Sequence, residues 1–350
     1  MTKWTLYIST IAVSLLSSAS LSANAQNISF ADQTVKTLCV SNWDTDGDSE
    51  LSQIEASAVT SLGTIFKGKK NITSFEELEY FTGLNTIDDY AFYQSSLQKV
   101  LFPNSVTSIG EYAFSETQLG EEIVIPGTVK IIGSYAFSEC SKLMRIILEE
   151  GVECINSESF TGPIHFMTLP STITYFAAAG INPYPSTGLS SRDYVFRMLV
   201  RSETPVPVKD YAFRRLFGEG ILIVPLGATE NYKNKNNWTN FYKIEEVGDV
   251  NEDGLLDDLD LSAIEDFITN GVSEFNPLQS DVNFDGVTDG KDVEYLKNYI
   301  ESTTSVSSIN LTPADTHVYT IDGRRLPDNI TISSLPHGIY ISNGRKFVVK

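Results

Sequence analysis

The sequence has few of the residues and motifs that most often carry catalysis. It holds three histidines and three cysteines in 350 residues, and their spacing fits no zinc site. It lacks G-x-S-x-G, H-E-x-x-H and phosphate-binding-loop motifs and any recognisable Cys/His nucleophile signature. A glycosidase that uses two carboxylates leaves no such motif, so the sequence alone does not exclude one. We expect a protein that is not an enzyme.

Positive charge is also scarce. Lysine and arginine total 25 against 45 acidic residues, which gives a formal net charge of −20. Nucleic acids and anionic membranes are bound through basic patches, so this balance argues against both as partners.

The three cysteines, Cys39, Cys140 and Cys154, are an odd number for a disulfide framework. Cys140 and Cys154 fall at different phases of the repeat described below, which makes a bridge between them difficult. Buried small hydrophobic residues are the favoured interpretation.

The sequence contains no apolar run long enough for a transmembrane anchor. The N-terminal run at 6–16 is short and serine-rich, follows Lys3, and precedes the small-residue site Ala23-Asn24-Ala25. This order is typical of an export signal at 1–25. Gln26, not cysteine, follows the expected cut, so no lipoprotein anchor is expected. The alternative is a buried N-terminal helix.

What the sequence does contain is a repeat of about 23 residues. I-D-D-Y-A-F at 87–92 recurs as I-G-E-Y-A-F at 109–114 and I-G-S-Y-A-F at 132–137. It decays to I-N-S-E-S-F at 155–160, and K-D-Y-A-F at 209–213 is a later echo. Between these blocks lie short alternating segments, most of them ending in proline, which predict strands. Such units bury their apolar faces only by stacking on one another.

The alternation assigns each strand residue to one of two faces. The core face is predicted to hold Leu97, Val100, Phe102, Ile123, Ile125, Leu143, Ile146, Leu148, Ile164, Met167 and Leu169. The open face is predicted to hold Lys99, Leu101, Glu122, Val124, Arg145, Ile147, Phe166 and Thr168. An exposed apolar row flanked by charge marks an interaction site, so we expect a protein or glycan ligand there. Alternatively, these residues simply suit strands, or a loop covers them.

The pattern I-G-x-Y-A-F … L-x-x-V-x-I-P resembles the BspA-type leucine-rich repeat of bacterial surface proteins. The likeness extends over 80–246, and its end at 224–241 resembles the closing cap of that family. The resemblance implies adhesion or ligand binding without catalysis.

An acidic loop at 44–55 precedes the repeats and has the residue spacing of an EF-hand loop. Asp44, Asp46, Asp48, Glu50, Ser52 and Glu55 occupy positions 1, 3, 5, 7, 9 and 12. Calcium prefers six to eight oxygen ligands, and this spacing turns alternate side chains inward. Ser49 stands at position 6, where glycine is usual. The alternatives are an acidic N-cap of a helix at 53–59 or a solvated turn.

Two further loops, at 249–260 and 281–292, follow the repeats, and each leads into a predicted helix. Their candidate calcium ligands are Asp249, Asn251, Asp253, Asp257 and Asp260, and then Asp281, Asn283, Asp285, Asp289 and Asp292. The pair resembles a type I dockerin over 247–301, which implies bound Ca²⁺ and a cohesin-like partner. Positions 10 and 11 are Asp258-Leu259 and Gly290-Lys291 instead of hydroxyl pairs. A purely structural calcium module is therefore equally compatible with the sequence.

The composition and the hydrophobic pattern of the sequence change again in its last segment. A Ser/Thr-rich linker at 302–308 is followed by alternating segments at 318–326, 336–341 and 344–350, which predict strands separated by Asp-Gly and Asn-Gly turns. The region 309–350 resembles the C-terminal sorting domain of secreted Bacteroidetes proteins. This resemblance implies export and retention at the outer surface. The alternative is a small β-sandwich without a sorting role.

Together these features predict a mixed α+β chain. An EF-hand-like cap at 26–79 is followed by a leucine-rich-repeat solenoid with short parallel strands, a small helical calcium module and a small all-β domain. The expected function is ligand binding by a secreted or surface protein. The alternative is a non-catalytic accessory component of a polysaccharide-degrading assembly.

Overall fold

The computed structural model describes residues 26–183, 195–213, 216, 220–271, 275, 277–304, 317–320, 324–327, 335–336, 338–342 and 345–349. These residues divide into two compact units, with the boundary between Val247 and Gly248. The export signal expected at 1–25 lies outside the described residues. Within these residues, every helix is too short or too polar to cross a membrane.

The first unit begins with two helices, α1 (Gln33–Trp43) and α2 (Gln53–Ala58). The carboxylate of Asp32 accepts hydrogen bonds from the first backbone N–H groups of α1. Ser52 and Glu55 form a capping box at the start of α2. The helix predicted after the first acidic loop is therefore confirmed, and its buried residues join the same core cluster as the repeats.

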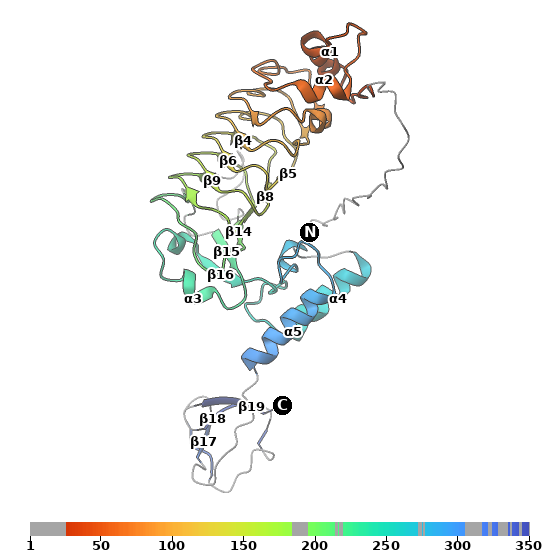
Figure 1. The fold of residues 1–350 in the computed structure, drawn as a ribbon. Helices are drawn as coiled ribbons and strands as arrows, with labels where there is room; N and C mark the ends of the chain where they lie inside the picture. Colours follow the sequence, from red (N-terminus) through yellow and green to blue (C-terminus); the bar gives the residue numbers. More distant parts are fainter. Residues whose placement is uncertain are drawn as a thin grey trace. The chain divides into compact units, whose positions relative to one another are not determined.

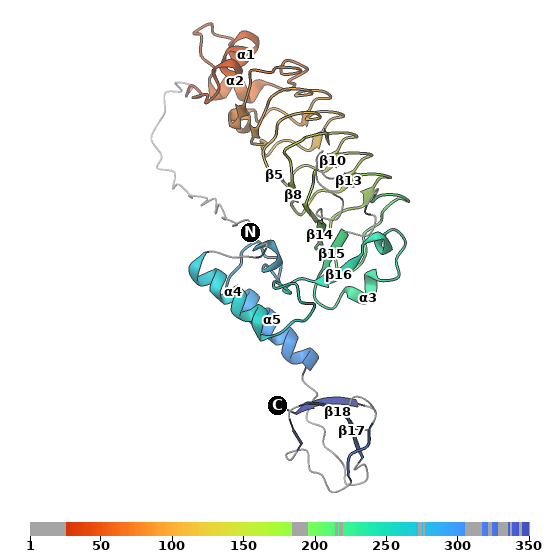
Figure 2. The ribbon, with the colours of Figure 1, turned by 180° about the vertical axis from the view of Figure 1, so that it is seen from behind.

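The repeats form a solenoid of short parallel strands (Figures 1 and 2). The largest sheet has six strands: β5 (Glu122–Ile125), β8 (Arg145–Leu148), β11 (Phe166–Leu169), β14 (Phe196–Val200), β15 (Gly220–Val224) and β16 (Lys243–Glu246). A second sheet holds β2 (Thr86–Ile87), β4 (Ser108–Ile109), β6 (Ile131–Ile132), β9 (Cys154–Ile155) and β12 (Tyr175–Phe176). A third holds β7 (Phe137–Ser138), β10 (Phe160–Gly162) and β13 (Ile181–Pro183). The predicted solenoid is confirmed.

The core of the solenoid contains a ladder of stacked phenylalanine rings. Phe92, Phe114, Phe137 and Phe160 lie one above the next, with ring centroids 5.0, 5.2 and 5.4 Å apart and interplanar angles of 10° or less. All four rings are buried. The register read from the repeat is therefore confirmed, because one slot in each coil is filled by the same residue type.

The ladder extends beyond the repeats that the sequence revealed. Phe66 stacks on Phe92 at 5.2 Å, and β1 (Ser74–Phe75) pairs in parallel with β3 (Lys99–Val100). An additional coil thus precedes residue 80, with the 3₁₀ helix η1 (Glu76–Tyr80) after its strand. No Tyr-Ala pair precedes Phe66, so the motif that marks the later coils is absent from this one.

Glycine in the repeat is explained by close approach of successive coils. A Cβ atom on Gly133 would lie 2.6 Å from the carbonyl carbon of Gly110, which no side chain tolerates. The next coil has Asn156 instead, and its amide nitrogen donates to the carbonyl of Ile132 at 3.0 Å. The decayed copy of the motif therefore replaces close packing with a side-chain hydrogen bond.

The C-terminal end of the solenoid is packed by aromatic residues. The segment after β15 contains α3 (Thr229–Tyr232) and the 3₁₀ helix η2 (Trp238–Asn240). Tyr232 and Trp238 are buried and meet edge to face at 5.0 Å. The Tyr232 hydroxyl donates to the carbonyl of Ser202 at 2.7 Å, so the buried phenol is satisfied. Tyr232 and Trp238 both belong to the core cluster of the solenoid.

The three cysteines carry free thiols. Cys39 and Cys140 are buried as predicted, whereas Cys154 is partly exposed. The Cys140 thiol donates to the carbonyl of Phe114 at 3.2 Å, and burial raises its pKa to about 11.

The second unit contains α4 (Asp258–Asn270), η3 (Pro277–Gln279) and α5 (Gly290–Thr304). Gly271 ends α4 in the left-handed conformation, at a φ of 67°. The helix α5 continues past its last apolar residue to Thr304. The first three residues of the predicted linker, 302–304, are therefore helical. Residues 305–308 lie outside the described part of the chain.

The tail holds a three-stranded antiparallel sheet of β17 (Val318–Thr320), β18 (Gly338–Ser342) and β19 (Arg345–Val349). The predicted strands are therefore present. The predicted Asp-Gly and Asn-Gly turns at 322–323 and 343–344 lie outside the described residues.

Candidate functional site

The three acidic loops share one backbone conformation. In each loop the residues at positions 4 and 6 have positive φ angles, which lets the chain turn around a central point. The residues and their φ angles are Gly47 (79°) and Ser49 (68°), Glu252 (59°) and Gly254 (85°), and Phe284 (60°) and Gly286 (91°). The first loop therefore adopts the shape of the other two even though its glycine is at position 4 instead of 6.

The loops also share one hydrogen-bond pattern. The carboxylate at position 1 accepts from the backbone N–H of position 6: Asp44 from Ser49 at 3.0 Å, Asp249 from Gly254 at 3.0 Å and Asp281 from Gly286 at 3.1 Å. The oxygen at position 3 accepts from position 5, and the oxygen at position 5 accepts from position 7. The carboxylate at position 12 accepts from positions 2 and 3. These bonds hold alternate side chains toward the inside of each loop.

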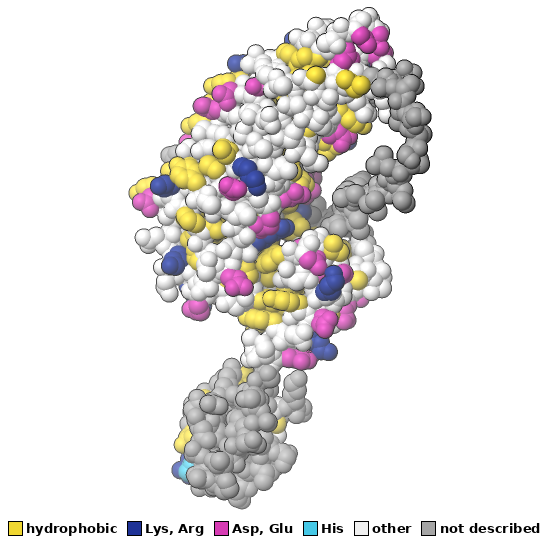
Figure 3. Space-filling model, in the orientation of Figure 1, with side chains coloured by type: hydrophobic (Ala, Val, Ile, Leu, Met, Phe, Trp, Pro, Cys, Tyr) yellow, Lys and Arg dark blue, Asp and Glu magenta, His cyan; other side chains and the backbone are white. Residues whose placement is uncertain are grey.

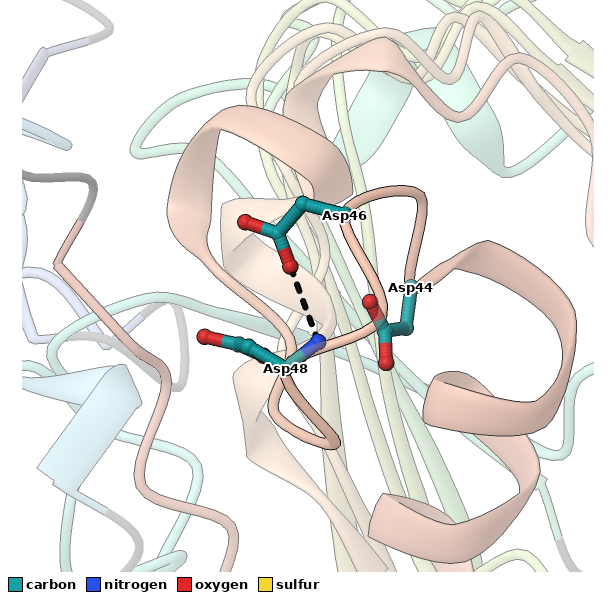
Figure 4. A group of neighbouring side chains, drawn as sticks. All are labelled: Asp44, Asp46 and Asp48. Carbon is teal, nitrogen blue, oxygen red and sulfur yellow. Dashed lines mark hydrogen bonds between the residues drawn. The ribbon is translucent and has the colours of Figure 1, made fainter.

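In the first loop, this arrangement brings three carboxylates together. Oxygen atoms of Asp44, Asp46 and Asp48 lie within 4.8 Å of one another, and Asp46 accepts from the backbone N–H of Asp48 (Figure 4). Glu55 closes the loop and accepts from the N–H groups of Thr45 and Ser52 at 2.7 and 2.9 Å. This oxygen-only set fits calcium.

In the second and third loops the closing carboxylates are buried. Asp260 and Asp292 are fully inaccessible, and Asp249 and Asp281 are nearly so. Burying carboxylates is costly unless a positive charge accompanies them, so a divalent cation would offset this cost. The residues present therefore fit calcium in both loops.

The environments shift the pKa values of several loop carboxylates. Hydrogen bonds, first from the Ser52 N–H, hold the pKa of Glu55 at about 2. The Lys291 N–H lowers the pKa of Asp289. Burial raises the pKa of Asp260, although three backbone N–H groups oppose this effect. Glu55 therefore stays charged, and a nearby cation would oppose the rise in the pKa of Asp260.

Some predicted ligands have other contacts. The Glu50 side chain pairs with Lys36 at 2.6 Å, which is compatible with a calcium loop because position 7 binds through its backbone carbonyl. The Ser52 hydroxyl is part of the α2 capping box. In the third loop the Lys291 ammonium lies 3.3 Å from carboxylate oxygens of Asp285 and Asp289, where it would compete with a calcium ion.

Ser49→Gly is expected to stabilise the first unit by about 1 kcal/mol, because a residue with a Cβ pays this cost for a left-handed backbone. Urea unfolding at fixed calcium measures the effect. Ser57→Gly is the matched control: Ser57 lies in α2, so the same change there is expected to destabilise by about 0.5 kcal/mol. Equal effects of the two substitutions would contradict the loop conformation.

The predicted open row is exposed at its N-terminal end, on β5 and β8 of the large sheet and beside β3, which pairs with β1 in a separate two-stranded sheet. Leu101 and Val124 are 46% and 43% exposed, Ile147 is partly exposed, and Lys99 and Glu122 are exposed. Phe166 and Thr168 are 4% and 0% exposed, so the prediction of an open row is wrong at these two residues. Figure 3 shows small hydrophobic patches among charged side chains over the solenoid.

The structure gives physical reasons for both corrections. The Arg145 guanidinium lies 5.5 Å from the Phe166 ring centroid and covers part of it. The Thr168 hydroxyl accepts from the Leu148 N–H at 2.8 Å and donates to the Leu148 carbonyl at 3.0 Å. Thr168 therefore fills hydrogen-bonding positions between β8 and β11 instead of facing outward.

Comparisons with known families match both the repeats and the region that contains the second and third acidic loops. Residues 64–179 match the family described as BspA type leucine rich repeat region, in six copies, and residues 247–315 match the dockerin type I domain. The match begins at 64, in the coil that precedes residue 80. Neither family description is that of an enzyme. A search of curated proteins gives no match.

Two solved structures are similar to this chain. One is a leucine rich cell surface protein from Faecalibacterium prausnitzii, at 20% identity and a TM-score of 0.20, covering 49% of this chain and 62% of its own. The other is a leucine-rich repeat protein from Bacteroides ovatus, at 16% identity and a TM-score of 0.22, covering 54% of this chain and 65% of its own. The chain thus spans slightly under two thirds of each.

Proposed function

We propose that this protein is a secreted surface protein that binds a protein or glycan ligand through the exposed sheet face at Leu101, Val124 and Ile147. The observation that carries the proposal is the exposure of this apolar row beside charged side chains. Arg145 and Glu122 form an ion pair of 2.9 Å at its edge. Exposed apolar surface bordered by charge is typical of an interaction site.

The face is rigid, which favours binding. Ile123 and Ile125 alternate with Glu122 and Val124 along β5 and are buried in the core. A ligand therefore meets side chains whose backbone is already fixed, so little conformational entropy is lost on binding.

Val124→Lys combined with Ile147→Lys is expected to weaken ligand binding at least tenfold, because charge replaces the apolar contact surface. The ligand is first identified by probing glycan and extracellular-matrix arrays with the mature protein, and affinity is then measured by calorimetry. Ile131→Lys is the matched control, since Ile131 is equally exposed but lies on β6 of another sheet. Unaltered affinity in the double variant would place the ligand elsewhere.

Calcium is proposed as a structural ion in this function. The three loops, at 44–55, 249–260 and 281–292, would each hold one ion, with dissociation constants of about 0.1–1 mM as in extracellular modules. The first loop would fix α2 at the start of the solenoid, and the other two would fix α4 and α5. No catalytic step involves these ions.

A second candidate function is that of an accessory component in a polysaccharide-degrading assembly. The match of 247–315 to the dockerin family and the exposure of Leu259 and Tyr295 favour it. Leu259 and Lys291, at position 11 of their loops, differ from the hydroxyl pairs expected for cohesin recognition. Pull-down with a panel of cohesin domains separates the two candidates: stable capture supports an assembly component, and failure of capture leaves a structural module.

Surface retention through the region 309–350 completes the proposal. The antiparallel strands β17, β18 and β19 support a folded domain of the kind that the sequence resembles. Deleting 309–350 and fractionating cells tests the sorting role, since loss of the protein from the surface is expected while its export through the signal at 1–25 continues.

A further inference from the structure

A second aromatic ladder, made of tyrosines, runs along the turns that precede the buried phenylalanines. The rings of Tyr90, Tyr112 and Tyr135 stack with centroids 5.0 and 4.7 Å apart and interplanar angles of 11° and 3°. Unlike the phenylalanines, all three tyrosines are partly exposed. Each has a positive φ angle, between 53° and 60°, a conformation that is unfavourable for a residue with a Cβ atom. The ladder is therefore maintained at the surface against a conformational cost.

Stacking alone does not explain why the ladder is built of tyrosine. The phenylalanine rings of the core stack equally closely, at 5.0 to 5.4 Å, without a hydroxyl group. The hydroxyl groups of Tyr90, Tyr112 and Tyr135 form no hydrogen bond with any residue that the structure describes. What a tyrosine adds is a phenol, which gives up an electron and a proton much more readily than a benzene ring does. The exposed edge is therefore a cluster of oxidisable groups in ring contact.

A fourth tyrosine beside the ladder is bonded to a proton acceptor. Tyr93 meets Tyr90 edge to face at 5.5 Å and Tyr112 at 6.0 Å. Its hydroxyl donates to a carboxylate oxygen of Glu116 at 2.9 Å, and this hydrogen bond raises the pKa of the phenol. The Lys67 ammonium, 5.4 Å from the Tyr93 ring centroid, disfavours a positively charged ring, so the proton must leave together with the electron. Because Glu116 can take that proton, Tyr93 is well placed to be oxidised beside two rings of the ladder.

Ring contact distinguishes the ladder from other exposed tyrosines. Tyr242 is 76% exposed, yet its ring contacts no aromatic ring among the described residues. A radical on such a tyrosine meets a second phenol only by collision with another molecule. Tyr112 and Tyr135 instead face each other at 4.7 Å in nearly parallel planes, so two phenols are already together before either is oxidised. Holding two reactants in contact favours their coupling strongly over a chance encounter.

We propose that this tyrosine edge is a site of oxidative cross-linking, at which a haem peroxidase and hydrogen peroxide join neighbouring rings, foremost Tyr112 and Tyr135. Each of the two phenols loses one electron and one proton and becomes a phenoxyl radical. The radicals form a carbon–carbon bond between ring carbons next to their oxygens, and the hydrogens on these carbons then move to the oxygens through solvent, which restores both phenols. Hydrogen peroxide takes up the two electrons and two protons and becomes two molecules of water. The dityrosine bridge joins successive coils that otherwise meet only through non-covalent contacts.

The test is oxidation of the full chain, dilute and in calcium, by a haem peroxidase with limiting hydrogen peroxide. The native monomer is expected to lose the mass of two hydrogen atoms and to gain dityrosine fluorescence, and peptide mapping should find the bond between rings of the ladder. Tyr112→Phe keeps the stacked ring but removes the central phenol, and it is expected to lower the yield of dityrosine in the monomer about tenfold. Glu116→Gln is expected to slow the coupling severalfold. Tyr242→Phe, the same change at a more exposed tyrosine outside the ladder, is the matched control and should leave the yield unchanged.

The control separates this site from general oxidation of a chain with 16 tyrosines. Absence of dityrosine from the native monomer, coupling only between molecules, or a bond mapped outside the ladder and Tyr93 would each overturn the proposal. Equal yields in Tyr112→Phe and Tyr242→Phe would do the same. If Tyr112→Phe fails to fold by thermal melting, Tyr135→Phe decides, and an unchanged yield there overturns the proposal. None of these outcomes affects the proposed ligand site on the large sheet.

Discussion

Phe137→Ala is expected to lower the free energy of unfolding of the first unit by about 3–5 kcal/mol, the usual cost of removing a buried phenylalanine ring. Phe137 is fully enclosed and stacks on Phe114 at 5.2 Å and on Phe160 at 5.4 Å. The substitution removes the transfer free energy of the ring and leaves a cavity between two coils. Guanidinium unfolding followed by circular dichroism measures the loss.

Because each coil contacts mainly its neighbours, the damage is expected to spread from Phe137 to the adjacent coils. Hydrogen exchange should show faster exchange in β6, β8 and β9 than in α1, which lies further away along the chain. Tyr242→Ala is the control, since Tyr242 is 76% exposed and its loss should change stability by less than about 0.5 kcal/mol. A loss below about 1 kcal/mol in Phe137→Ala would contradict the stacked core.

Asp249→Ala combined with Asp281→Ala is expected to abolish calcium-dependent stabilisation of the second unit. Each site contributes about 2.7 kcal/mol at a free calcium concentration one hundred times its dissociation constant. Both aspartates stand at position 1 and orient their loops through the N–H groups of Gly254 and Gly286. Scanning calorimetry in calcium and in chelator measures the change.

The thermal unfolding transition of the solenoid should be unchanged in the double variant, since neither aspartate belongs to the core cluster of the solenoid. Asp266→Ala is the matched control, because Asp266 is exposed on α4 outside the loops. Native protein that melts identically with calcium and with chelator would refute the calcium sites.

The parts of the fold that follow from a regular spacing of residues in the chain were predictable from the sequence. The spacing of Phe92, Phe114, Phe137 and Phe160 was sufficient to place the core, because one coil uses a fixed length of chain. The helices after the acidic loops were predictable for a similar reason: position 9 of each loop is also an N-cap. Local patterns and the global fold agree at these positions.

The features that depend on a contact with one particular residue elsewhere in the fold were not predictable from the sequence. The coil that contains Phe66 has the ring without the Tyr-Ala pair of the motif, so the visible repeat did not mark it; the stacking and the family match from residue 64 do. Thr168 has an outward position in the strand pattern, yet its hydroxyl is held by the backbone of Leu148. The contact of Lys291 with Asp285 and Asp289 likewise depends on how the loop folds around it.

The direction of the hydrogen bonds between coils determines how this solenoid responds to force. Successive coils are joined by backbone bonds such as that from Phe92 to Ala113 and that from Phe114 to Ala136, both 2.8 Å long. Tension along the stacking axis therefore pulls these bonds open lengthwise, and the coils separate one after another from an end, each releasing a length of slack chain. Tension across the axis loads the bonds of a coil together and meets greater resistance. A solenoid built in this way yields gradually when it is pulled along its length, so it absorbs mechanical work before it comes apart.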